Sequence, residues 1–99
     1  MTVLGKTHYV NGQRVWKLDR DKLTFYYKNG AVKAAGRYSN DKMQGDWTFY
    51  RESGQLVQTR RLENNTKEGR WIRYDKNGKV EYDETFVNGK VVKRYENKP

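Results

Sequence analysis

The sequence predicts an all-β fold, an antiparallel meander of repeated β-hairpins that forms a ribbon or an open-sheet stack. The main observation is a fixed period, because equal intervals separate Leu23, Trp47 and Trp71. Turn glycines recur with the same period, and no stretch shows the apolar spacing of an amphipathic helix. A fixed period of about 24 residues is typical of stacked supersecondary units.

The period divides the chain into units within a single domain, residues 1–99. We expect three full units at residues 23–46, 47–70 and 71–94, preceded by a partial unit at residues 9–22. In the partial unit, Tyr9-Val10-Asn11-Gly12 resembles Phe86-Val87-Asn88-Gly89. Joining it to the first full unit requires an insertion of about five residues, which fits the irregular ends of repeat arrays.

Each full unit is predicted to contain two strands. Aromatic residues favour strand at 23–28, 46–51 and 70–75, and β-branched and aromatic residues favour strand at 31–38, 55–62 and 79–87. Asn-Gly or Ser-Gly pairs predict a hairpin turn within each unit. Polar segments at 40–45 and 64–69 predict longer turns between units. The positions that define the repeat are Leu23, Trp47, Trp71, Gly30, Gly54, Gly78, Gly45 and Gly69.

The hairpin register has two alternatives. A two-residue Asn-Gly turn pairs Tyr27 with Val32 and places Val32, Leu56 and Val80 on the face that carries the tryptophans. Tyr26, Tyr50 and Tyr74 then line the other face beside Arg37 and Arg61. A three-residue turn with a glycine bulge moves the tyrosines to the side of Val32, Leu56 and Val80. We favour the two-residue form because it collects more apolar residues on one face.

Composition predicts a thin core built largely by rings. The chain is 34% hydrophobic and 33% charged, yet 14% of its residues are aromatic. Tyrosine and tryptophan supply apolar area with a polar end, which suits a half-exposed core. The net charge of +9 is spread along the chain and favours acidic partners. The absence of cysteine excludes disulfides and thiolate chemistry.

Nothing in the pattern of polar residues predicts catalysis. His8 is the only histidine, and it lies in the irregular terminal piece without a paired nucleophile. Asp83 and Glu84 are adjacent in a predicted strand, so they point to opposite faces and cannot act as a pair. The expectation is a non-enzyme without metal or cofactor.

The units resemble the MORN (membrane occupation and recognition nexus) repeat, and more closely its bacterial variant found in putative repeat-type antitoxins. The resemblance rests on Gly45-Asp46-Trp47-Thr48-Phe49-Tyr50, Gly69-Arg70-Trp71-Ile72-Arg73-Tyr74 and Asn77-Gly78-Lys79-Val80, together with Phe86-Val87-Asn88-Gly89-Lys90. It covers residues 23–90 and, more weakly, residues 9–22. It implies a stack of antiparallel hairpins with a binding role, and it suggests an antitoxin-like or immunity-like function.

Protein–protein recognition is therefore the expected function, with an acidic protein face as the partner. The candidate binding residues are rings and cations that recur with the repeat, namely Tyr26, Tyr50, Tyr74, Arg37, Arg61 and Arg73. The alternative is an anionic ligand, either a phospholipid head group or single-stranded nucleic acid, bound by the basic, aromatic-rich face. Self-association through free sheet edges is also compatible with the pattern. Residues 1–5 are too short an apolar run for a signal peptide, so a cytoplasmic location is expected.

Overall fold

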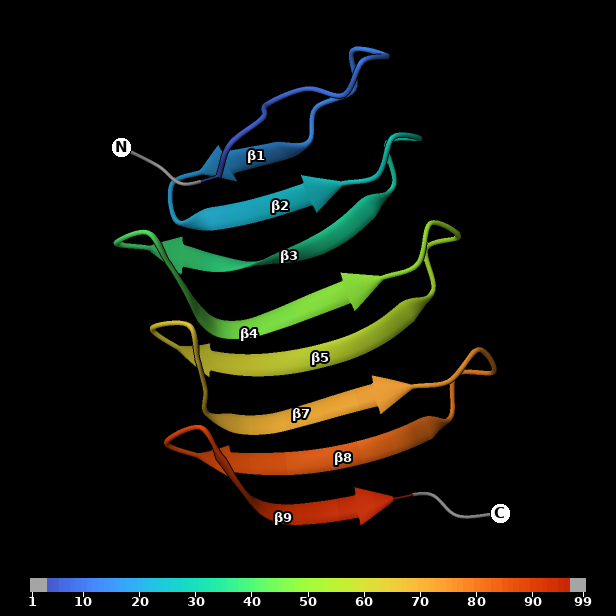
Figure 1. Cartoon of the computed structure of the whole chain (residues 1–99). Helices are drawn as coiled ribbons and strands as arrows, with labels where there is room; N and C mark the ends of the chain where they lie inside the picture. The colour runs from blue at the N-terminus through green and yellow to red at the C-terminus, as the bar shows by residue number, and fades with distance from the viewer. Residues whose placement is uncertain (1–3, 97–99) are drawn as a thin grey trace.

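The computed structural model describes residues 4–96, which form one antiparallel sheet (Figure 1). Its strand order is β1-β2-β3-β4-β5-β7-β8-β9, with β6 paired to β5. The sheet measures 43 × 32 × 17 Å, so it is a single layer. The predicted all-β hairpin meander is confirmed. The strands are β1 (Trp16–Asp19), β2 (Lys22–Tyr26), β3 (Val32–Ser39), β4 (Lys42–Tyr50), β5 (Leu56–Glu63), β6 (Thr66–Lys67), β7 (Gly69–Tyr74), β8 (Val80–Val87) and β9 (Lys90–Glu96).

The turn within each unit is the three-residue form, so the favoured two-residue turn is wrong. The amide of Tyr27 donates to the Ala31 carbonyl at 2.8 Å, and the amide of Gly30 donates to the Tyr27 carbonyl at 3.0 Å. Gly30 has φ +89°, the left-handed conformation that closes a three-residue hairpin with a glycine bulge. The same two bonds recur from Arg51 to Gln55 and from Asp75 to Lys79.

A second irregularity next to this turn decides which side chains share a face. Tyr26 pairs with Val32, but Phe25 pairs with Ala34, so Lys33 is an extra residue in β3. Corresponding shifts separate Phe49 from Tyr50 and Arg73 from Tyr74. Val32 therefore lies on the side of Tyr26, contrary to the two-residue prediction, as do Leu56 and Val80 beside their own tyrosines. The three tyrosines still lie opposite the tryptophans, as predicted.

The turns between units are shorter than predicted. Ser39 pairs with Lys42, which leaves only Asn40 and Asp41 in the turn, with φ values of 54° and 61°. Positive φ at both central residues defines a type I′ turn, whose twist matches that of paired strands. Asn64-Asn65 and Asn88-Gly89 show the same positive φ values. The predicted loops at 40–45 and 64–69 are instead two-residue turns followed directly by strand.

The terminal piece also differs from its prediction. The amide of Tyr9 donates to the Gln13 carbonyl at 2.8 Å, and the amide of Gly12 donates to the Tyr9 carbonyl at 3.0 Å. This is the bonding of the Tyr27 turn and not of the Asn88-Gly89 turn. No insertion is needed, because the strands that follow Tyr9 are shorter than those of the later units.

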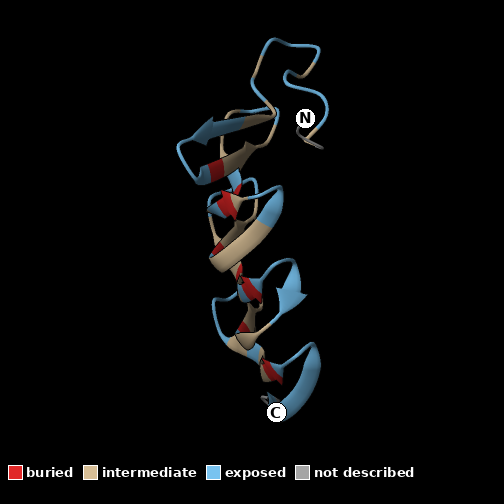
Figure 2. Cartoon of the chain, turned by 90° about the vertical axis from the view of Figure 1, so that its left-hand side faces the viewer, coloured by how far each residue is buried: buried red, intermediate tan, exposed pale blue. Residues whose placement is uncertain are grey.

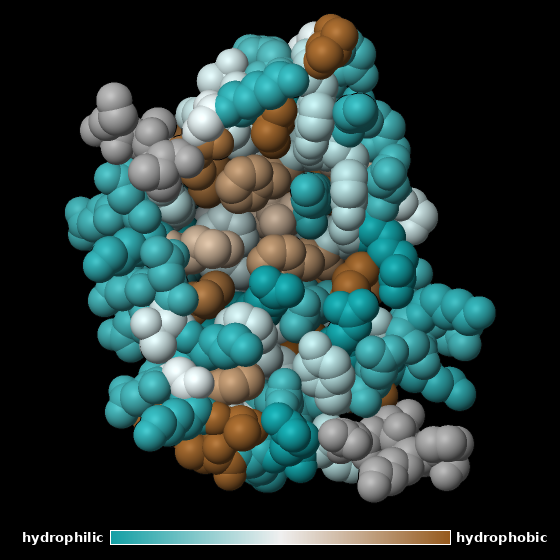
Figure 3. Space-filling view, viewed as in Figure 1, coloured by the Kyte–Doolittle hydropathy of each residue, from teal (hydrophilic) through white to brown (hydrophobic). Residues whose placement is uncertain are grey.

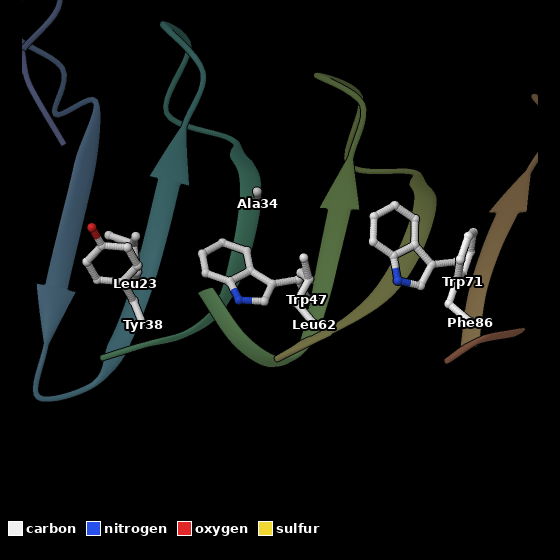
Figure 4. Packing of buried hydrophobic residues seen from close by; sticks show 7 residues of the cluster. All are labelled: Leu23, Ala34, Tyr38, Trp47, Leu62, Trp71 and Phe86. Atoms are coloured by element: carbon white, nitrogen blue, oxygen red, sulfur yellow. The ribbon is translucent and has the colours of Figure 1, made fainter. Parts of the chain in front are cut away.

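The core is a single column of buried side chains along one face of the sheet (Figures 2 and 4). We call this the tryptophan face. It is built around Trp47, which is fully buried, and Trp71, which is 9% exposed. The other buried apolar residues are Leu23, Ala34, Tyr38, Leu62 and Phe86. One sheet face thus supplies the apolar burial of the fold.

Trp47 and Trp71 are each fixed by a hydrogen bond to the neighbouring strand of the preceding hairpin. The Nε1 of Trp47 donates to the Arg37 carbonyl at 2.9 Å, and the Nε1 of Trp71 donates to the Arg61 carbonyl at 2.7 Å. The register of β3 and β4 shifts by two residues at this point, from Arg37 opposite Gln44 to Ala35 opposite Thr48. A shift of two keeps every side chain on its original face.

Gly36 makes room for the first indole. A β-carbon at this position would lie 2.3 Å from Cδ2 of Trp47, far inside van der Waals contact. The ring therefore lies directly on the backbone of β3. This close approach, and not a positive φ, is what requires glycine at position 36.

We predict that Gly36→Ala lowers the free energy of unfolding by about 1–3 kcal/mol, the usual cost of overpacking. Urea denaturation measures it. In a Trp47→Leu background the added methyl group meets no indole, so the same substitution should cost much less. Equal costs in the two backgrounds would show that the clash is not with Trp47.

Candidate functional site

The face opposite the tryptophans carries the predicted binding tyrosines, and we call it the tyrosine face. Tyr26, Tyr50 and Tyr74 each occupy the last position of an aromatic strand, and all three are half-buried. Arg37 and Arg61 lie on this face too, because they pair with Gln44 and Asp46 in the same alternation. Arg73 does not join them, since it pairs with Tyr82 on the tryptophan face.

A groove of about 660 Å³ runs across the tyrosine face between the first two full units. We call it the tyrosine groove. Tyr26 and Tyr50 line it together with small or apolar residues, and Lys22 is the only charged residue among those that line it. The remaining lining residues are Thr24, Ala31, Val32, Ala35 and Gly54. The groove combines rings, apolar floor and one cation, the chemistry of a recognition surface more than of a reaction site.

Hydroxyl groups from the neighbouring turns hold the backbone of these tyrosines. Tyr9 Oη donates to the Tyr26 carbonyl at 2.6 Å, and Tyr27 Oη donates to the Tyr50 carbonyl at 2.7 Å. Each bond links one hairpin to the next, because its partners are 17 and 23 residues apart. The residues that correspond to Tyr27 in the next two units are Arg51 and Asp75, which have no phenol hydroxyl. This hydroxyl-to-carbonyl latch is therefore specific to the N-terminal half of the sheet.

The predicted arginines of the tyrosine face are paired with carboxylates. Arg37 contacts Asp21 at 3.2 Å, and Arg61 contacts Asp46 at 3.1 Å, both with exposed side chains. They line a second hollow of about 250 Å³ that also includes Glu63 and Glu68. Two cations and two acids share this hollow, so it offers little net attraction to an anion.

Arg73 lies in a separate pocket of about 300 Å³ on the tryptophan face, which we call the basic pocket. Four cationic residues line it, namely Lys33, Arg51, Arg60 and Arg73. The other lining residues are Tyr27, Phe49, Tyr50, Val57 and Gln58. Only Arg73 and Tyr50 of this set were predicted as site residues, so the structure brings together a group that the sequence reasoning missed.

Arg60 is the centre of the basic pocket. It stands one full period after Gly36, so Trp71 faces the guanidinium of Arg60 where Trp47 lies on the bare backbone of Gly36. Its Cζ lies 4.1 Å from the centre of the Phe49 ring and 5.0 Å from that of Trp71. Burial lowers the pKa of the Arg60 guanidinium, and the nearby charge of Arg73 acts in the same direction. In the sequence, Arg60 can be singled out by aligning the units at their common period, because a cation there replaces the glycine of the preceding unit.

The last strand presents its ring to the opposite face from the earlier units. Tyr95 stands one period after Trp71, but it pairs with Asp83 and is 57% exposed. The register of β8 and β9 shifts by one residue here instead of two. In the earlier units, Gly45 and Gly69 lie at the corresponding positions with φ values of 66° and 84°. The corresponding residue of β9 is Lys93. A side chain disfavours that backbone conformation, and a shift of one residue reverses the faces.

Tyr95 thereby joins a polar cluster on the tyrosine face. Arg70 Nε lies 2.9 and 3.1 Å from the two carboxylate oxygens of Asp83, and all three residues line one hollow with Thr85 and Lys93. The hydrogen bond from Arg70, followed by its charge, lowers the pKa of Asp83. Asp83, the acidic residue of this cluster, is thus neutralised by its ion pair with Arg70.

The described residues show neither a membrane helix nor a metal cluster. Between residues 4 and 96, no helix has the length and apolar character required to cross a membrane. In the same part of the chain, no group of three or more His, Asp or Glu residues is placed to hold a metal ion. His8 is exposed, and its Nδ1 lies 3.0 Å from Oγ1 of Thr7.

Apolar side chains gather over β2 to β4 on the face that Figure 3 shows, and polar side chains surround them. Equivalent positions of successive units on the tryptophan face also differ in polarity. Phe25 and Phe49 are followed by Arg73, while Gly36 and Arg60 are followed by Glu84. At these positions the tryptophan face therefore becomes more charged towards the C-terminal end of the sheet.

Comparison with known protein families gives a match to a repeat family. The family described as MORN repeat variant matches residues 43–64 and 67–88, which run from the second residue of β4 into the turn after β5 and from β6 into the turn after β8. No curated protein and no solved structure gives a significant match. The matched segments each contain one tryptophan strand and its following partner strand.

We predict that Tyr27→Phe lowers the free energy of unfolding by about 1 kcal/mol, because the Tyr50 carbonyl loses its donor in a half-buried site. Chemical denaturation measures the change. Tyr95→Phe is the control, since that ring is exposed and should change stability little. Equal effects of the two variants would contradict a latching role for Tyr27.

We predict that Asp83→Asn destabilises the protein at about pH 7 but not in strong acid. The pKa of Asp83 is lower in the folded chain, so its contribution exists above the unfolded pKa and is lost as pH falls through the folded value. Unfolding free energies measured from about pH 7 to about pH 2 provide the check. Glu52→Gln, at an exposed turn position, is the control, and a destabilisation by Asp83→Asn that persists in acid would contradict the assignment.

Proposed function

We propose that this MORN-type repeat protein recognises another protein without catalysis, and that an acidic segment of the partner lies in the tyrosine groove. MORN repeats serve generally as binding modules, which agrees with a chain whose described surfaces are grooves and charged patches. The observation that carries the proposal is the groove itself, where Tyr26 and Tyr50 flank an apolar floor beside Lys22. Tyrosine is enriched among the residues that dominate interface energies.

The geometry favours an extended segment of the partner. The groove is open along its length and crosses neighbouring strands, so a peptide could contact both tyrosines at once. Lys22 is exposed at its edge and provides the attraction for a carboxylate. The net charge of +9 would speed the encounter with an acidic face. The resemblance to repeat-type antitoxins supports a finer form of the proposal, in which the partner is a toxic protein held inactive in the cytoplasm.

The test is retention of proteins from the native host on the immobilised chain, at low salt and again at about 1 M salt. A partner anchored by rings should survive the high-salt wash. Tyr50→Ala should reduce its binding by about 2 kcal/mol, the scale of an interface hot spot. Tyr95→Ala is the matched control, because that tyrosine is on the same face at the far end of the sheet.

Lys22→Glu gives a second variant that leaves the rings intact, since Lys22 is exposed. Charge reversal should weaken an acidic partner at low salt. If Tyr50→Ala unfolds the chain, Lys22→Glu still tests the groove. Retention of nucleic acid or lipid alone, with steep loss at high salt, would instead support the anionic-ligand alternative and overturn the protein-recognition proposal.

A further inference from the structure

Four cationic side chains converge without an acid in the basic pocket of the tryptophan face. Of its nine lining residues four are cationic and none is acidic. The hollow that holds Arg37 and Arg61 contains two glutamates, and the hollow at Arg70 contains Asp83. The positive charge that is spread along the sequence is thus concentrated by folding at a second pocket, which shares only Tyr50 with the tyrosine groove.

Two of the bulges that follow the three-residue turns contribute to this convergence. Lys33 is the extra residue of β3, and Val57 is the extra residue of β5. Both are directed to the tryptophan face, where they line the pocket with Phe49. Lys33 Nζ lies 5.7 Å from the centre of the Tyr27 ring. Arg51 enters from the turn after β4, so together with β3, β5 and β7 four separate segments contribute cations.

The guanidinium groups of the pocket are short of acceptors. The Nε atoms of Arg51 and Arg60 are buried and have no hydrogen-bond partner. Arg60 uses Nη2 to donate to Oε1 of Gln58 at 2.7 Å, and Arg73 Nε lies 3.2 Å from Oε1 of Glu81. Within residues 4–96, Glu81 is the one carboxylate that forms an ion pair with any of the four cations. Buried polar groups normally have partners, so the pocket is chemically incomplete for a cluster of this charge.

We propose that the basic pocket binds a phosphate monoester. A monoester carries a charge of about −1.5 to −2 near pH 7 and presents three acceptor oxygens, which suit two or three guanidinium groups. Arginine recognises such oxygens through paired N–H donors, and Lys33 adds a point charge. Tyr27, Phe49 and Val57 provide apolar walls for the organic part of the ester. A volume of about 300 Å³ accommodates a small head group of this kind.

The test is titration of the full chain with phenyl phosphate, followed through the Nε–H signals of arginine by NMR and through tryptophan fluorescence. Arg60 contacts Trp71, so a ligand that engages its guanidinium should change the emission of that indole. Saturable binding is expected. Combining Lys33→Gln with Arg51→Gln should weaken it by about tenfold or more, because two charge-assisted contacts are lost.

The matched control combines Arg37→Gln with Arg61→Gln, which removes the same charge from the tyrosine face. It should leave the affinity for phenyl phosphate within about twofold, because exposed charges at a distance are screened by salt. Equal weakening in the two double variants, or no saturable binding, would overturn the proposal. Lys33 is exposed, and neither Lys33 nor Arg51 belongs to the cluster of buried apolar residues, so their replacement leaves that cluster in place.

A second probe separates the sources of the phosphate. Vesicles of phosphatidic acid diluted in phosphatidylcholine present the monoester at a surface, whereas phenyl phosphate presents it free in solution. Loss of vesicle binding in the Lys33 and Arg51 variant, but not in the control, would support the pocket with a lipid source. Binding of phenyl phosphate without vesicle binding would support it with a soluble source. The substitutions at Lys33 and Arg51 change no residue that lines the tyrosine groove, so failure of one proposal leaves the other standing.

Discussion

The indole that lies on the preceding strand is the contact on which the sheet depends. A single layer has no second sheet or helix to cover it, so the apolar side chains must bury one another along one face. Trp47 achieves this by lying on Gly36 and donating to the Arg37 carbonyl. Because the bond crosses from one hairpin to the next, it ties successive units together. The two-residue irregularity at this point keeps the whole column of buried side chains on one face.

The fixed period of the sequence was sufficient to predict the class of fold and the division of rings between the two faces. It was not sufficient for the turns. Asn29-Gly30 is compatible with both a two-residue and a three-residue turn, since glycine supplies a positive φ in either. The choice is made by the neighbouring bulge at Lys33, which restores the alternation further along β3. That combination depends on pairing across strands and leaves no signal in the local sequence.

In the candidate site, too, some residues could be predicted from the sequence and others could not. Tyr26 and Tyr50 could be predicted because they recur at one position, and they meet in a groove. Arg73 could be selected as a cation beside rings, and its place two residues after Trp71 in one strand puts it on the tryptophan face. Lys33 would lie on the tyrosine face under strict alternation, and only its bulge moves it to the basic pocket. Arg60 was accessible to sequence reasoning through its correspondence with Gly36.

Lys93 has a consequence for whatever pairs with β9. Lys93 stands where the earlier units have a glycine. The register of β9 therefore shifts by one residue where the earlier units shift by two, and Tyr95 lies on the opposite face from the tryptophans. Any strand laid against this edge, whether from the same polypeptide or from another molecule, would inherit that inverted phase. Its ring-bearing positions would then continue the surface of Tyr26 and Tyr50 instead of the buried column. The side chain at position 93 thus determines which face of the sheet would carry the rings of an added strand.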